Sequence, residues 1–256
     1  MADIEIARDG AVLVVTINRP QKKNALTFAM YRAIEEALRT TDPDIRAVVI
    51  TGAGETFTAG NDLQDFLGVA TSGKASFDEL PQARFLDALV QTTRPLVAAV
   101  HGPAIGVGAT MLLHCDLVYA SETARLEMPF VSLGLVPEAA SSLLLPERVG
   151  HAVAAELLLL GASVDARRAK ELRLVNEIVP SQELVAVARA KAHALAAKPP
   201  EALHAARELI RGQGRAAVLE RMRVEGAYFS ERLASAEARA AFGAFLGRGR
   251  ATGVNA

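Results

Sequence analysis

The stretch PLVAAVHGPAIGVGA, residues 95–109, points to the fold class of this chain. Leu96–Val100 is a short apolar run that follows a proline, and this pattern predicts a buried strand. His101-Gly102-Pro103 turns the chain, and glycines at 106 and 108 begin a predicted helix over 106–114. Because the first turn of a helix has backbone N–H groups without intrahelical partners, this junction can hold an anion or a developing oxyanion.

Strands and helices alternate through the rest of the first half. Predicted strands, rich in β-branched or apolar residues, cover 4–7, 11–17, 47–51, 96–100, 117–120 and 125–127. Predicted helices cover 27–40, with Thr27 as the N-cap, as well as 82–93 and 106–114. We expect a hairpin turn at Asp9-Gly10, a glycine-rich loop at 52–62 and a mobile segment from about 64 to 81.

From His151 onward the sequence is almost entirely helical in character. Segments rich in Ala, Arg and Glu cover 151–160, 165–171, 181–197, 199–211, 216–232 and 235–246. An alternating half followed by a helical third predicts an α/β core with a helical C-terminal region, divided near residue 195.

Composition limits the function classes. The 256 residues, 51% of them hydrophobic, suffice for one large globular domain with a substantial core. A net charge of −1, no Trp and few aromatics disfavour nucleic-acid binding. Cys115 is the single cysteine, so no intrachain disulfide or cysteine-rich zinc site can form, and no metal is expected. No apolar run spans a bilayer and no signal-peptide pattern begins the chain, so we expect a cytoplasmic protein without a membrane partner.

Two segments have the composition of a ligand site. ETFTAGNDL, residues 55–63, follows a strand and a glycine turn, and its small residues let a ligand approach the main chain. Asp62 is placed to cap a following helix, although an ordinary strand-to-helix loop has the same composition. In the second segment, residues 95–109, a dinucleotide fingerprint would need a third glycine where Met111 stands, so NAD binding is not indicated.

Taken together, these segments resemble the crotonase (enoyl-CoA hydratase/isomerase) superfamily. The matching segments are NRP at 18–20, KNAL at 23–26, FTAGNDL at 57–63, PLVAAVHGPAIGVG at 95–108, CDLVYA at 115–120 and LGLVP at 133–137. The resemblance covers about residues 4 to 247. Each motif alone is moderately specific, whereas the ordered set at these spacings is highly specific.

The resemblance implies a crotonase-like spiral of β-β-α units with a helical C-terminal region. Residues 1–195 would form the core that binds CoA thioesters, and residues 196–256 a region that builds homotrimers or hexamers. The expected partner is an acyl-CoA thioester, with coenzyme A as part of the substrate and no separate cofactor.

The resemblance also assigns residues to roles. The backbone N–H groups of Asn61 and Val107 would form an oxyanion hole for the thioester carbonyl. The residues expected near coenzyme A are Lys23, Ala25, Leu26, Ala59 and Asp62. A pair of lysines at 22 and 23 would equally suit a solvated surface.

One departure bears on the reaction. Hydratases of this family use two glutamates, and the matching positions here are Thr110 and Phe130, neither of which can act as a carboxylate base. Glu138 instead matches the catalytic acid of many Δ3,Δ2-enoyl-CoA isomerases. A structural glutamate at a helix N-terminus after Pro137 would fit the same residues. In its apolar setting we expect the carboxyl pKa to rise toward neutrality.

The resemblance therefore predicts an isomerase that moves a proton from C2 to C4 through a dienolate. Two alternatives stay open. One is another reaction of the superfamily, such as hydration, hydrolysis or decarboxylation. The other, from a different class, is a non-catalytic acyl-CoA-binding protein.

Overall fold

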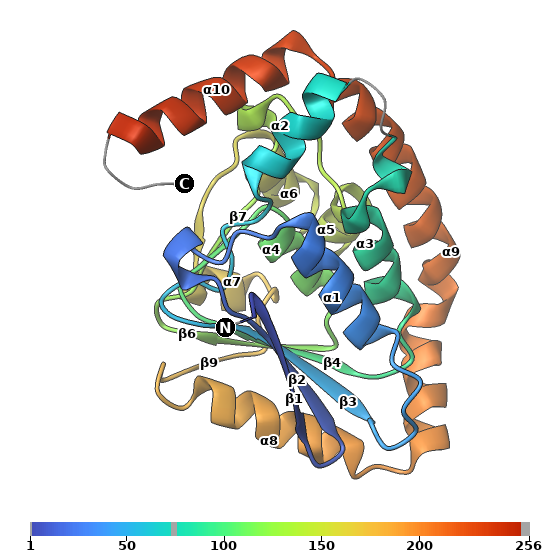
Figure 1. Cartoon of the computed structure of the whole chain (residues 1–256). Helices are drawn as coiled ribbons and strands as arrows, with labels where there is room; N and C mark the ends of the chain where they lie inside the picture. The colour runs from blue at the N-terminus through green and yellow to red at the C-terminus, as the bar shows by residue number, and fades with distance from the viewer. Residues whose placement is uncertain (1, 73–75, 252–256) are drawn as a thin grey trace.

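The computed structural model describes residues 2–72 and 76–251, and its centre is a six-stranded sheet (Figure 1). The strands, in spatial order, are β1 (Ile4–Asp9), β2 (Val12–Ile17), β3 (Ala47–Gly52), β4 (Leu96–Val100), β6 (Leu117–Ser121) and β9 (Glu177–Val179). β1 and β2 form the predicted antiparallel hairpin, whose turn needs Gly10 at φ +59°. All other neighbours in this sheet are parallel.

A second, smaller sheet continues the strands of the first. It consists of β5 (Pro103–Ile105), β7 (Arg125–Glu127) and β8 (Val164–Asp165). β5 follows β4 and β7 follows β6, while an isolated bridge from Thr58 to Ala104 extends β3 in the same way. Each turn of the chain thus adds a strand to one sheet, a strand or bridge to the other, and then a helix. This repeat confirms the predicted spiral of β-β-α units.

Helices cover both faces of the main sheet. α8 (Leu184–Ala196) packs Ala188 and Ala192 against Val49 and Val97 on one face, and Figure 1 shows it below the sheet. α1 (Phe28–Leu38) and α3 (Pro81–Gln91) cover the opposite face. Burial on both faces explains why β3 and β4 are continuous apolar runs rather than alternating ones.

The remaining helices are short and lie around the second sheet or at the edges of the core. They are α2 (Leu63–Ser72), α4 (Val107–Thr110), α5 (Ser141–Val149), α6 (His151–Leu159) and α7 (Ala166–Glu171), with 3-10 turns η1 (Pro20–Lys22), η2 (Phe77–Glu79), η3 (Met111–His114) and η4 (Val131–Leu133). Thr27 caps α1 as predicted, because its side chain accepts a hydrogen bond from the N–H of Met30.

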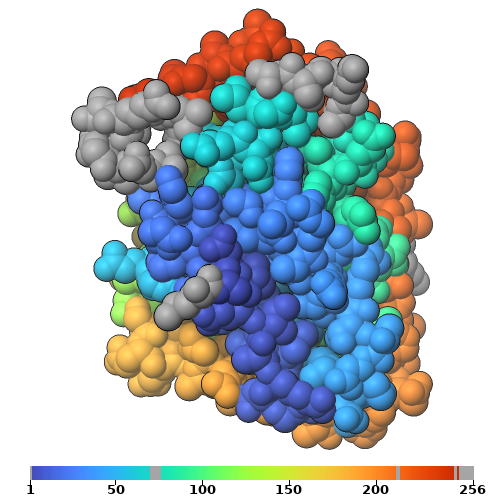
Figure 2. Space-filling model, in the orientation of Figure 1, coloured from blue at the N-terminus to red at the C-terminus, as the bar shows by residue number. Residues whose placement is uncertain are grey.

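Two long helices end the described chain. α9 (Pro200–Leu233) runs along the side of the molecule past α3, and α10 (Ala236–Ala251) crosses above α2 (Figure 1). Both helices pack against the main hydrophobic core, in which Phe229 of α9 and Phe242 of α10 are fully buried. In Figure 2 the N-terminal third of the chain forms most of the visible face, with α8 below it and α10 above. Within the described ranges, no helix has the length and apolar character needed to cross a bilayer.

Several boundaries differ from the sequence prediction. Within the segment expected to be mobile, Leu63–Ser72 forms the helix α2, in which Phe66 packs against Phe28 and Phe229. Residues 73–75 of that segment lie outside the described residues. The helix expected over 106–114 is a single α-turn continued by the 3-10 turn η3. The two helices expected over 199–211 and 216–232 are one, α9. The proposed division after residue 195 stays a prediction and falls at the end of α8.

Candidate active site

The two predicted ligand loops lie side by side. Ile105 donates its backbone N–H to the carbonyl of Thr58 at 2.9 Å, which joins the glycine-rich loop to β5. Gly60 adopts φ +87°, and a Cβ there would lie 2.7 Å from the carbonyl oxygen of Ile105. Only glycine permits this approach. This close approach places the backbone just before Asn61 in contact with the backbone just before Val107.

The backbone N–H groups of Asn61 and Val107 have no hydrogen-bond partner among the described residues. At the first position, Leu26 bonds to the groups on either side, because it donates to the carbonyl of Gly60 at 2.8 Å and accepts from Asp62 at 2.9 Å. That ladder leaves the Asn61 N–H pointing away from Leu26. At the second position, Val107 begins α4, where a first-turn N–H has no intrahelical acceptor. Since α4 is one turn long, the amides themselves, rather than a long helix dipole, are available to an anion.

Glu138 is buried at the same place, with 1% of its surface exposed. The hydroxyl of Thr110, from α4, donates to one carboxylate oxygen, and Nε2 of Gln82, from α3, donates to the other at 3.2 Å. Burial raises the pKa of Glu138 to about 8, with a further rise from the negative charge of Glu225; the two hydrogen bonds oppose the shift. The expectation of a raised carboxyl pKa is confirmed.

The chain turns sharply immediately after this carboxylate. Ala139 and Ala140 both have positive φ, at 60° and 54°, and α5 begins only at Ser141. Glu138 therefore precedes the helix, and its side chain is held in the interior instead of capping the α5 N-terminus. The expectation that a helix N-terminal glutamate would explain this residue is not met by the geometry.

Thr110 and Phe130, at the two positions that match the hydratase glutamates and are expected to line the substrate pocket, both lie near Gly106. The Thr110 hydroxyl that contacts Glu138 also lies 3.4 Å from the carbonyl oxygen of Gly106. Phe130 is 4% exposed, and its ring edge lies 4.0 Å from the position of a Cβ on Gly106. Thr110, which the resemblance matches to a hydratase glutamate, thus supplies a hydroxyl donor to the Glu138 carboxylate.

Tyr31 and Gln82 belong to the same cluster, and sequence reasoning missed both. The Tyr31 hydroxyl donates to Oδ1 of Asn61, and burial followed by the negative charge of Glu138 raises its pKa well above the ordinary value. Tyr31 is therefore a neutral donor at neutral pH. Each residue occupies an inward position of an amphipathic helix, where the sequence pattern is that of ordinary core, so no signal distinguished them.

The five residues expected near coenzyme A lie in two paired segments. Ala59 donates its N–H to the carbonyl of Lys23 at 2.9 Å, and Leu26 pairs with the chain on either side of Asn61. Lys23 is exposed, whereas Leu26 has no exposed surface. Ala25 accepts a hydrogen bond from Arg19 at its carbonyl. These segments form one continuous strip beside the site, and their contact with coenzyme A stays a prediction.

Asp62 combines two structural contacts. One carboxylate oxygen accepts the N–H of Gln64 at 3.0 Å, which is the predicted cap of the following helix. The other accepts from Nη1 of Arg19 at 2.6 Å. Within the described part of the chain, no group of three His, Cys, Asp or Glu side chains is arranged to hold a metal ion.

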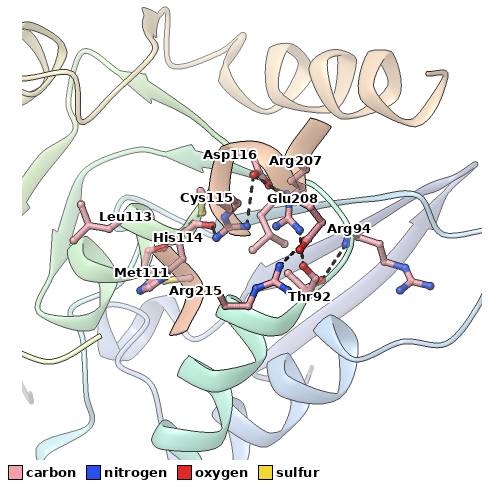
Figure 3. Close-up of polar contacts among 12 residues, drawn as sticks. Thr92, Arg94, Met111, Leu113, His114, Cys115, Asp116, Arg207, Glu208 and Arg215 are labelled. Carbon is pink, nitrogen blue, oxygen red and sulfur yellow. Dashed lines mark hydrogen bonds and ion pairs between the residues drawn. The ribbon is translucent and has the colours of Figure 1, made fainter. Parts of the chain in front are cut away.

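A second polar cluster ties α9 to the sheet. Figure 3 shows Asp116, directly after Cys115, beside Arg207 of α9. Nε of Arg207 donates to both Asp116 oxygens at 3.0 and 2.9 Å, and Nη1 donates to the carbonyl of Thr92 at 2.5 Å. Asp116 also accepts the N–H of Leu96 at 2.8 Å, at the start of β4. Its contacts are those of a structural acid that anchors the C-terminal helix.

The site is thus a buried carboxylic acid beside two free amides on a spiral α/β fold. A family model described as enoyl-CoA hydratase/isomerase matches residues 7–252. The chain therefore belongs to the enoyl-CoA hydratase/isomerase family of the crotonase superfamily.

Relatives within the family include enzymes named for different reactions. Enoyl-CoA delta isomerase 2 of Rattus norvegicus is 38% identical over 215 residues, which cover 81% of this chain and 54% of that protein. 2,3-dehydroadipyl-CoA hydratase of Escherichia coli K12 is 33% identical over 249 residues, 96% of each chain. A solved enoyl-CoA hydratase/isomerase from Pseudoalteromonas atlantica has a TM-score of 0.90 and 44% identity, covering 96% of this chain and 98% of that one. The chain spans about half the length of the rat isomerase.

Proposed function

We propose that this enzyme is a Δ3,Δ2-enoyl-CoA isomerase. The observation that carries the proposal is the environment of Glu138, a fully buried carboxylate whose partners are Thr110 and Gln82. A hydratase glutamate at position 110 would hold a catalytic water, but the threonine there donates to Glu138 instead. The site offers one acid to move a proton and no second carboxylate at the two positions used for hydration.

The reaction needs Glu138 in both protonation states. The ionised carboxylate removes a proton from C2 of the 3-enoyl thioester, and the resulting acid returns that proton to C4. A pKa of about 8 places the carboxyl near the working pH, which suits both half-steps. Gln82 can interact with both protonation states of Glu138. Its Oε1 is buried without a partner among the described residues, so rotation of the amide would let Oε1 accept a hydrogen bond from the protonated acid.

The negative charge of the dienolate needs donors at the thioester oxygen. We propose the backbone N–H groups of Asn61 and Val107 for this role, since both are free and their loops are joined through Gly60. Loss of one such donor typically costs about 2.7–4 kcal/mol of barrier. Tyr31 supports the arrangement by donating a hydrogen bond to Oδ1 of the Asn61 side chain.

Two further parts of the proposal concern binding and assembly. Coenzyme A would lie along the strip formed by residues 23–26 and 59–62. The C-terminal helices would build a trimer or hexamer. Two apolar side chains on α9 support this role. Leu209 and Ile210 are 83% and 84% exposed, and exposed apolar patches are typical of protein–protein interfaces.

Hydration is the second candidate, because relatives of similar length are named as hydratases. It would require a water between Glu138 and C3 of a 2-enoyl thioester, with Glu138 alone doing the work of two carboxylates. A binding protein without turnover is the third. A protein without turnover would have no function for the buried, hydrogen-bonded carboxyl of Glu138.

Side-by-side assays separate the three functions. Wild-type enzyme is incubated with a 3-enoyl-CoA and with a 2-enoyl-CoA, and the products are resolved by chromatography. Isomerisation of the first without hydration of the second supports the proposal. Glu138→Gln should fold normally and lose at least 100-fold in kcat. The matched control, Glu147→Gln on the surface of α5, should retain wild-type turnover. Rapid hydration of the 2-enoyl substrate, or normal isomerisation by Glu138→Gln, would reject it.

A further inference from the structure

The turn that follows Glu138 is held in a conformation that alanine disfavours. Ala139 and Ala140 are consecutive left-handed residues, at φ 60° and 54°. A side chain with a Cβ rarely adopts this region, and two in succession persist only where surrounding contacts hold them. The direction in which the Glu138 side chain leaves the backbone depends on this turn, so the groups that hold the turn also set the position of the acid.

Two buried side chains hold the turn from opposite sides. His114 of η3 places Nε2 2.8 Å from the carbonyl oxygen of Ala139. Glu225 of α9, 6% exposed, accepts the N–H of Ala140 at 2.6 Å with one oxygen. Its other oxygen accepts the N–H of Ser142 at 3.0 Å and the Ser142 hydroxyl at 2.5 Å. Among the described residues, these three hydrogen bonds all come from donors, an arrangement that favours the ionised carboxylate.

We propose that Glu225 is a positioning residue for Glu138: it fixes the turn that aims the acid and keeps a second negative charge beside it. The inference rests on the proposed role of Glu138 as the proton carrier. It also gives the C-terminal helix a part in the active site, because residue 225 lies 87 positions beyond the acid on α9, the segment assigned to assembly.

The groups around Glu138 make the charge of Glu225 effective. Thr110 faces the acid from α4, Gln82 from α3 and Tyr31 from α1, and all three are neutral. Among the described residues, Glu225 is the group whose charge raises the Glu138 pKa, in addition to the larger effect of burial. Burial raises the pKa of Glu225 itself, and the hydrogen bonds from Ser142 and Ala140 together with the positive charge of Arg221 oppose that rise. Removing the Glu225 charge should therefore lower the proton affinity of Glu138, an effect that a purely structural helix cap would not have.

The test uses charge-removing and charge-keeping variants of the full-length protein. Infrared spectroscopy follows the protonated carboxyl of Glu138 through a pH titration, with the band assigned by its loss in Glu138→Gln. In Glu225→Gln the titration midpoint should move to lower pH, and kcat should fall by about 10- to 100-fold at nearly unchanged KM. Glu225→Asp keeps the charge but shortens the side chain, so it should keep the midpoint and lose kcat. Glu220→Gln, an exposed carboxylate paired with Arg223 on the same helix, should match wild type in both.

A wild-type midpoint and wild-type kcat in a folded Glu225→Gln would overturn the inference. If circular dichroism shows that this variant does not fold, Ser142→Ala replaces it, since it removes one donor to Glu225 and keeps both carboxylates. That variant should lower kcat without raising KM, and unchanged kcat counts against the inference. The infrared titration needs no turnover, so absent isomerase activity in wild type would reject the proposed function and leave the link between the two glutamates testable.

Discussion

Replacing Glu138 with glutamine should make the protein more stable, and increasingly so as the pH rises. The carboxyl is fully buried, and its pKa moves from an ordinary 4.5 to about 8. The folded protein therefore keeps a proton that the unfolded chain has lost between these two values, and stability falls with rising pH across that window. At about 1.36 kcal/mol for each pH unit, the span of about 3.5 units corresponds to about 5 kcal/mol.

Glutamine has nearly the same shape as the protonated acid and cannot ionise. Its amide also suits the site, because Thr110 can donate to its oxygen and the unpartnered Oε1 of Gln82 can accept from its nitrogen. At pH 4 the variant and wild type should have similar stability. At pH 9 the variant should be more stable by up to about 5 kcal/mol, or about 10 °C in Tm for a chain of this size.

Thermal unfolding of both proteins from pH 4 to pH 9, followed by circular dichroism, measures the difference. All other titrating groups are shared, so the difference between the two curves isolates residue 138. The control is Glu147→Gln, whose exposed carboxyl should give a difference that stays nearly flat over the same range. A Tm difference for Glu138→Gln that does not grow between pH 5 and pH 8 would refute the claim that this carboxyl is buried and hard to ionise.

Three further predictions concern the surroundings of the acid. Thr110→Val removes the hydroxyl that favours the ionised Glu138, so the rise of kcat/KM with pH should shift to higher pH, and kcat at pH 7 should fall about tenfold; an unshifted profile would count against this contact. Tyr31→Phe leaves Oδ1 of Asn61 without its donor and should destabilise the protein by about 1 kcal/mol in urea unfolding while lowering kcat; full activity would show that the Asn61 side chain needs no support. Gly60→Ala forces a Cβ to 2.7 Å from a carbonyl oxygen at positive φ, so it should abolish turnover and lower Tm, and a fully active variant would exclude the close approach of the two loops.

Much of the fold could be predicted because its signals are local. β3 and β4 are short β-branched or apolar runs with turn residues at their ends, and Thr27 stands where a cap is needed. In the second sheet, β7 forms where a strand was predicted, whereas β5 and β8 carry no such signal. β5 and β8 have three and two residues, and pairing across the spiral, rather than propensity, makes them strands. α2 was not predicted, because the glycine and serine content of its segment weakened the helix signal, and the burial of Phe66 supports the helix.

The residues of the site show the same contrast between local sequence signals and contacts made by distant segments. Asn61, Val107 and Glu138 could be proposed from the sequence because they lie within recognisable motifs, and their roles stay predictions. Tyr31 and Glu225 come from helices far away in the chain, and nothing near them in the sequence indicates a ligand or an acid. Their roles follow from where the spiral and α9 place them, which is a property of packing between distant segments.

The transfer of hydrogen within the substrate tests the central claim most directly. A 3-enoyl-CoA carrying two deuterium atoms at C2 is converted in ordinary water, and the 2-enoyl product is analysed by mass spectrometry and NMR. If the buried Glu138 carries the proton from C2 to C4, part of the deuterium removed from C2 will appear at C4. Product with only solvent hydrogen at C4, or a hydrated product in its place, would contradict the account.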